Sequence, residues 1–124
     1  MLADARPFSG FAVKDVERAR QFYGETLGLR VSESDGLLTL ELAGGANVVV
    51  YPKPDHTPAT FTILNFAVDD IDVAVNQLAA SGITFQRYDG FDQDDKGVVR
   101  GGGPFIAWFT DPDGNILSVL QPRP

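Results

Sequence analysis

The first half of the chain alternates between short apolar segments and one segment with helical spacing. The apolar run at residues 8–13 predicts a buried strand. Apolar positions spaced three or four apart from Val16 to Leu27 predict an amphipathic helix. Asp15 precedes this helix, where a carboxylate can accept free backbone N–H groups, and Gly28 suits its end. Three further strands are predicted over residues 29–34, 37–42 and 47–51, with turns at Asp35-Gly36 and Gly44-Gly45.

The same order of elements returns in the second half. The hexapeptide at residues 11–16, Phe-Ala-Val-Lys-Asp-Val, is matched by Phe-Ala-Val-Asp-Asp-Ile at residues 66–71. Asp70 is the second predicted helix cap, and Gly82 the second helix end. Strands are predicted over residues 61–68, 83–88, 105–110 and 115–121, with an irregular Gly- and Asp-rich excursion at 89–104 and a tight Asp-Pro-Asp-Gly turn at 111–114.

These patterns predict an α+β protein with one domain over residues 1–124. It comprises two tandem βαβββ modules, module one at about 7–52 and module two at about 61–122. The linker at 53–60 is rich in proline, which cannot continue a strand. Because each module is too small to bury its apolar face alone, the two are expected to share a core.

Composition narrows the possible functions. The chain has no cysteine, so disulfides, thiolate nucleophiles and cysteine-based metal sites are excluded. A formal charge of −7 argues against nucleic acid as a partner, because binding nucleic acid depends on Lys and Arg neutralising phosphates. There is no apolar run long enough to span a membrane and no apolar start typical of a signal peptide, so we expect a cytoplasmic protein without a membrane partner.

Two βαβββ modules, each with a Phe-Ala-Val-x-Asp junction between strand and helix, resemble the vicinal oxygen chelate superfamily. Leu-Gly-Leu at residues 27–29 and Asp-Pro-Asp-Gly before the last strand extend the resemblance over nearly the whole chain. This superfamily includes glyoxalase I, fosfomycin-resistance thiol transferases, extradiol dioxygenases and bleomycin-resistance proteins. The resemblance implies cupped mixed sheets around a ligand cavity, often in a homodimer; another ferredoxin-like repeat is the alternative fold.

The resemblance also implies four positions for metal ligands, which are His, Gln or Glu in the enzymes of the superfamily. Counting from the two cap aspartates and from the turn glycines places these positions at Phe8, Ile63, Val49 and Ser118. Three of these side chains have no ligand atom, and a serine hydroxyl is a poor ligand for a hard cation. We therefore expect neither a metal nor another cofactor.

A metal-free small-molecule binding protein, resembling the bleomycin-resistance branch, is the leading functional hypothesis. The first alternative is an enzyme of the same superfamily: a glyoxalase-like lyase, an isomerase or a dioxygenase-like enzyme. Such an enzyme would have displaced metal ligands or metal-free chemistry. The second is a structural dimerisation module with a filled core. A binding protein requires a cavity with polar handles, whereas an enzyme requires converging histidine or carboxylate groups.

Strand periodicity indicates which side chains accompany the four positions on the ligand-facing side. Gly10 accompanies Phe8, Tyr51 accompanies Val49, and Asn65 accompanies Ile63. Further ligand-binding candidates, together with Ser118, are Trp108, as a stacking platform or as core, and Arg100, as an anion clamp or as a salt bridge to the nearby aspartates. The aspartates at 89, 92, 94 and 95 are expected in a solvated loop, as is His56, the only histidine. The sequence assigns no residue a catalytic role and does not identify the ligand.

Overall fold

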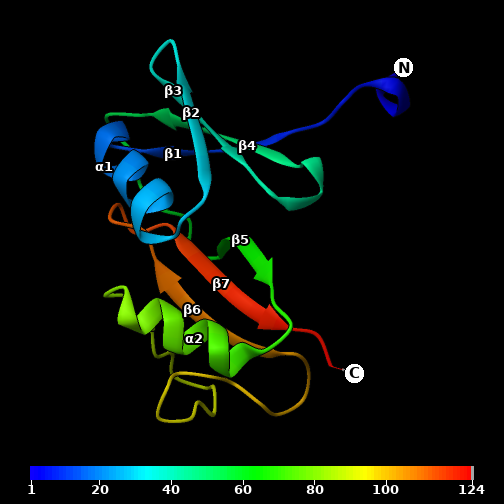
Figure 1. Ribbon diagram of the computed structural model, residues 1–124, viewed down its shortest axis with the longest axis vertical. Helices are drawn as coiled ribbons and strands as arrows, with labels where there is room; N and C mark the ends of the chain where they lie inside the picture. The colour runs from blue at the N-terminus through cyan, green and yellow to red at the C-terminus, as the bar shows by residue number, and fades with distance from the viewer. Residues whose placement is uncertain (124) are drawn as a thin grey trace. The chain divides into compact units, whose positions relative to one another are not determined.

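The computed structural model describes residues 1–123, which form two compact units. Met1–Thr57 make up unit 1, and the chain from Pro58 onward makes up unit 2. The elements of unit 1 are η1 (Leu2–Asp4), β1 (Ser9–Val13), α1 (Val16–Gln21), η2 (Phe22–Thr26), β2 (Arg30–Ser34), β3 (Leu37–Glu41), η3 (Ala43–Gly45) and β4 (Asn47–Pro52) (Figure 1).

The sheet of unit 1 has the strand order β1-β4-β3-β2, in which β1 and β4 are parallel and the other pairs antiparallel. Asp35 and Gly36 form the two-residue turn between β2 and β3 with φ values of 54° and 79°. A type I′ hairpin turn requires positive φ at both positions, so the predicted turn is confirmed.

The helix of unit 1 changes its winding halfway along. Asp15 caps α1 by accepting a hydrogen bond from the backbone N–H of Arg18 at 3.1 Å, as predicted. The predicted helix continues to Thr26, but its second half, η2, has π-helical instead of α-helical winding, with Leu27 N–H donating to the Phe22 carbonyl. This winding accompanies the burial of Tyr23, whose ring centroid lies 5.6 Å from that of Phe11 in β1.

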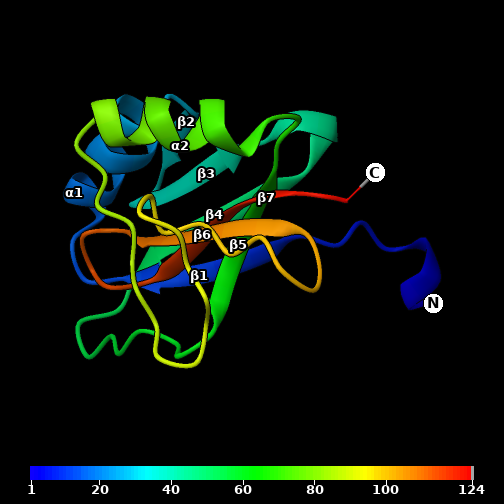
Figure 2. The ribbon, with the colours of Figure 1, turned by 90° about the horizontal axis from the view of Figure 1, so that it is seen from below.

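Unit 2 contains β5 (Thr62–Ala67), α2 (Ile71–Ala80), β6 (Phe105–Thr110) and β7 (Ile116–Gln121). The strand order is β5-β7-β6, with β5 parallel and β6 antiparallel to β7. Figure 2 shows α2 lying over one face of β6 and β7. The α+β class with two mixed sheets, of four and three strands, is therefore confirmed.

The predicted strand at residues 83–88 is wrong: this segment is irregular. It runs beside the outer edge of β6, the place that β2 takes beside β3 in unit 1. Only the backbone N–H of Gln86 bonds to the strand, donating to the Trp108 carbonyl at 2.8 Å. Farther along the same edge, Val99 and Ile106 form an isolated bridge. Module two is therefore βαββ, with an irregular segment in place of the second strand of the predicted βαβββ order.

The core of unit 2 lies between its sheet and α2. Alternate residues of β6 and β7 are buried on this side, including Phe109 and Leu117, and Ile71 and Val75 of α2 are buried with them. Asp70 caps α2 by accepting from the N–H groups of two first-turn residues at 3.0 and 3.2 Å, which confirms the second predicted cap. Since α2 covers one face of the sheet, the side chains of the opposite face do not pack against this helix.

Candidate functional site

The face of the β5-β7-β6 sheet opposite α2, called the Trp108 face below, combines aromatic and neutral polar side chains. Trp108 of β6 and Asn65 of β5 both pair with Ser118 of β7, which lies between them. Directly paired residues point to the same face of a sheet, so these three side chains lie together. The sequence prediction that Asn65 and Ser118 face the same side agrees with this register.

Hydrogen bonds fix the polar side chains of the Trp108 face. The buried Ser118 hydroxyl donates to the side-chain oxygen of Asn65. The indole N–H of Trp108 donates to the hydroxyl of Thr62 at 3.1 Å. The indole N–H therefore ties the ring of Trp108 to strand β5, and Asn65, whose side-chain oxygen is engaged by Ser118, remains exposed.

Two aromatic rings from residues 83–104, called the irregular segment from here on, contact Trp108. The centroid of Tyr88 lies 5.5 Å from that of Trp108 at an interplanar angle of 79°, and the centroid of Phe91 lies 5.2 Å away at 51°. These edge-on and tilted geometries are the favourable ones for aromatic pairs. Phe91 is 53% exposed, whereas burial raises the pKa of the Tyr88 hydroxyl above its ordinary value. We call these three residues the aromatic cluster.

The segment that presents Tyr88 and Phe91 is held in place by the side chain of Gln93. Its amide oxygen accepts from the backbone N–H of Tyr88 at 2.8 Å, and its amide nitrogen donates to the carbonyls of Gln86 at 2.9 Å and Gly97 at 2.8 Å. The first two contacts satisfy backbone groups that a neighbouring strand would otherwise bond. The side chain of Gln93 therefore takes the place of a missing peptide group.

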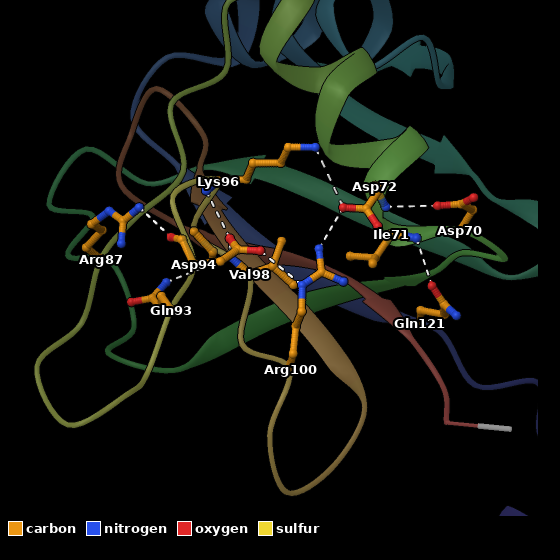
Figure 3. A network of polar contacts seen from close by, with 11 residues as sticks. Asp70, Ile71, Asp72, Arg87, Gln93, Asp94, Lys96, Val98, Arg100 and Gln121 are labelled. Atoms are coloured by element: carbon orange, nitrogen blue, oxygen red, sulfur yellow. Dashed lines mark hydrogen bonds and ion pairs between the residues drawn. The ribbon is translucent and has the colours of Figure 1, made fainter.

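A second network ties the same excursion to α2 (Figure 3). Arg100 donates to Asp72 of α2 at 2.6 Å and to Asp94 at 3.0 Å, while Asp94 accepts from the backbone N–H groups of Lys96 and Val98. Arg100 thus lies apart from the Trp108 face, and its contacts are those of the salt-bridge alternative. An anion clamp would need this guanidinium free, so the geometry does not support that role.

Ile63 does not share the regular alternation that the sequence suggests. The register of β5 against β7 shifts between Thr62 and Leu64, which makes Ile63 an extra residue in the strand. Strict alternation back from Asn65 would place Ile63 on the Trp108 face. Because of the shift, Thr62 instead supplies the side chain that bonds Trp108.

In unit 1, three of the four candidates lie together on one side of the sheet. Gly10 pairs with Val49, and the ring of Tyr51 comes within 3.8 Å of the position that a Cβ on Gly10 would take. Tyr51 remains 41% exposed. Phe8 precedes β1 and is 70% exposed, so the predicted strand begins one residue too early.

The four positions that the family resemblance assigns to metal ligands do not fit a metal ion. Phe8, Val49 and Ile63 carry no donor atom, and the hydroxyl of Ser118 is engaged with Asn65. Within residues 1–123, no group of three or more His, Cys, Asp or Glu side chains could hold a metal ion. His56 is only partly exposed, and its Nε2 atom is buried with no hydrogen-bond partner in the described residues, so the expectation of a solvated side chain is wrong.

Three contributors to the site were missed from the sequence. Thr62 was missed because a strand-alternation argument cannot foresee the register shift at Ile63. Tyr88 and Phe91 escape the sequence prediction because one falls in the predicted strand 83–88 and the other in the irregular excursion at 89–104. The one available signal was the density of aromatic residues around the Gly- and Asp-rich segment.

Comparisons with solved structures extend over almost the whole chain. TnmS3, an antibiotic binding protein from Streptomyces sp. CB03234, is 25% identical, with 97% of this chain and 98% of that chain covered and a TM-score of 0.67. The glyoxalase family protein from Enterococcus faecalis is 21% identical (97% and 99% covered, TM-score 0.71). The fosfomycin resistance protein FosX from Listeria monocytogenes is 14% identical (97% and 94%, TM-score 0.71). The last two show a shared fold.

None of the helices formed by residues 1–123 has the length and apolar character needed to cross a bilayer. No curated protein matches the chain. The family model described as Glyoxalase/Bleomycin resistance protein/Dioxygenase superfamily matches residues 8–119, which include both strand-to-helix junctions and the first four residues of the closing strand. The chain therefore belongs to this superfamily, the vicinal oxygen chelate superfamily that its repeated junctions resemble.

Proposed function

We propose that this protein binds a small aromatic molecule at the aromatic cluster of unit 2, without the help of a metal ion. The observation that carries the proposal is the arrangement of Trp108, with Tyr88 and Phe91 against its ring and the exposed amide of Asn65 on the same face. A flat apolar surface beside a few fixed polar groups is the usual composition of a small-molecule site.

Two further observations support binding rather than catalysis. The metal-ligand positions of the superfamily hold Phe8, Val49, Ile63 and Ser118, which leaves a Lewis acid without ligands there. A neighbour at 25% identity, TnmS3, is described as an antibiotic binding protein. We extend the proposal to a homodimer on the basis of the family resemblance, and light scattering in solution should then give twice the mass of one chain.

The test is binding of acridine, a planar neutral probe, at pH 8 in the presence of EDTA, measured by quenching of Trp108 emission and by calorimetry. Trp108 is the only tryptophan, so its emission reports on this face alone. Phe91→Ala, which removes an exposed ring without opening the core, should weaken binding by about threefold to tenfold, the value of one aromatic contact.

The matched control is Val73→Ala, which removes an exposed apolar side chain from α2 on the other side of the sheet. It should leave acridine binding unchanged. Equal losses in both variants, or no binding by the wild-type protein, would contradict the proposal. Elemental analysis should find well under one metal ion per chain, and a stoichiometric metal would refute the metal-free part.

A further inference from the structure

Unit 2 carries most of the negative charge of the protein. From Pro58 to the end, the sequence has nine acidic and four basic side chains, a formal charge of −5 out of the total of −7. Such an excess attracts cations and repels anions over a distance of about one Debye length, about 8 to 10 Å at ordinary salt. The positions of the few cations therefore decide which ligands the aromatic cluster can accept.

All four basic side chains of unit 2 have partners inside the unit. Their contacts are Arg100 with Asp72 and Asp94, Lys96 with Asp72 at 3.7 Å, Arg87 with the Asp94 carbonyl at 2.6 Å, and Arg123 with the Arg100 carbonyl at 3.2 Å. Arg100 also makes a cation–π contact within this unit. Its guanidinium carbon lies 5.4 Å from the centroid of the Phe105 ring. Phe105 is outside the aromatic cluster. Arg100 and Lys96 are paired with carboxylates, whereas Arg87 and Arg123 are hydrogen-bonded to backbone carbonyls.

Two exposed aspartates are close to Phe91 in the sequence. Asp89 and Asp92 lie within two residues of Phe91. The backbone N–H of Phe91 donates to the Tyr88 carbonyl at 3.4 Å, which closes a short turn. Because consecutive Cα atoms are about 3.8 Å apart, both carboxylates lie within about one Debye length of the cluster in any rotamer. The two carboxylates make the electrostatic potential at the rings negative. This adds to the negative potential that each aromatic ring has over its own faces.

We propose that the ligand of the aromatic cluster is a planar aromatic cation. This inference rests on the proposed function, the binding of an aromatic molecule at the cluster. Such a ligand stacks its ring on Phe91 and Trp108, and its charge is stabilised by the ring faces and by Asp89 and Asp92. The neutral polar groups on the same face, Thr62 and Asn65, carry no charge that would oppose it.

The test compares two probes with the same ring system, 9-aminoacridine, a cation at pH 7.5, and acridine-9-carboxylate, an anion. In 20 mM NaCl, calorimetry should show the cation binding at least tenfold more tightly than the anion. The ratio should fall to about threefold or less in 500 mM NaCl, because salt screens exposed charges. Asp92→Asn should weaken cation binding about twofold at low salt, whereas Asp69→Asn, an equal charge change at the start of α2, should not.

The outcomes separate this inference from the proposed function. If both probes bind with equal affinity and both lose affinity in Phe91→Ala, the cation preference is overturned while the aromatic site stands. If neither probe binds, both proposals fail. If the cation binds equally well to the wild-type protein, Phe91→Ala and Trp108→Ala, it is attracted to the surface in general, and the inference is overturned.

Discussion

Replacing Gln93 with Ala should detach the irregular segment from the sheet of unit 2. The Gln93 amide makes three hydrogen bonds of 2.8 to 2.9 Å, to the backbone of Tyr88, Gln86 and Gly97. The substitution leaves one N–H and two carbonyl groups without these partners. Since the site is partly buried, water can replace some of the lost bonds, so we expect a cost of about 1 kcal/mol for each bond and about 2 to 3 kcal/mol in total.

That cost should be visible in thermal and chemical unfolding. For a domain of this size, 1 kcal/mol corresponds to a shift in melting temperature of about 4 °C, so Gln93→Ala should melt about 8 to 12 °C below the wild-type protein. The near-ultraviolet circular dichroism of Trp108 should also weaken, because Tyr88 and Phe91 are no longer fixed against its ring.

Two variants identify the cause. Gln93→Glu keeps nearly the same shape but cannot donate to the two carbonyls, so it should lose about as much stability as Gln93→Ala. Gln77→Ala, at an exposed position of α2, is the control and should stay within about 0.5 kcal/mol of the wild type. A Gln93→Ala protein with unchanged stability and an unchanged Trp108 spectrum would refute the view that this amide replaces a strand.

Asp70→Ala should lower the free energy of unfolding by about 1 kcal/mol, as the loss of a helix cap usually does, whereas Asp69→Ala next to it should be nearly neutral; urea denaturation measures both, and equal effects would argue against the cap. A second prediction concerns pH. Burial raises the pKa of Asp94, but hydrogen bonds from the backbone N–H of Val98 and from Arg100 outweigh it and lower the pKa overall. Asp94 therefore stabilises the fold above its unfolded pKa of about 3.9, and this contribution is lost as pH falls through its lower folded pKa. The stability gap between wild type and Asp94→Asn should be largest near pH 7 and shrink towards pH 3; a constant gap would contradict the assignment.

The features that the sequence predicts correctly are local. Asp15 and Asp70 cap helices because a carboxylate before a helix has donors within a few residues. The Asp35-Gly36 turn follows from the tolerance of these two residue types for positive φ. The family follows from the same local signals, since the repeated junction is a cap placed after a strand.

The features that the sequence does not predict depend on side-chain hydrogen bonds and strand registers that no residue pattern encodes. Residues 83–88 have the apolar spacing of a strand, yet Gln93 satisfies the backbone groups that would have bonded to a neighbouring strand. The role of Trp108 depends on Thr62, 46 positions away, and on a one-residue shift in pairing at Ile63. No local pattern encodes a hydrogen bond between a side chain and a distant strand.

The irregular segment beside β6 also bears on how the protein avoids aggregation. A free strand edge is a template on which another chain can add a strand. Along the outer edge of β6, backbone groups of Trp108 and Ile106 are hydrogen-bonded by Gln86 and Val99. The backbone between Gln86 and Val99 is irregular, so it does not offer a straight edge on which another strand could pair. Deleting this excursion would leave the apolar strand Phe105–Thr110 with a straight open edge, and we would expect such a shortened protein to form β-rich oligomers. We therefore expect the segment that presents Tyr88 and Phe91 to Trp108 to protect the sheet from polymerising as well.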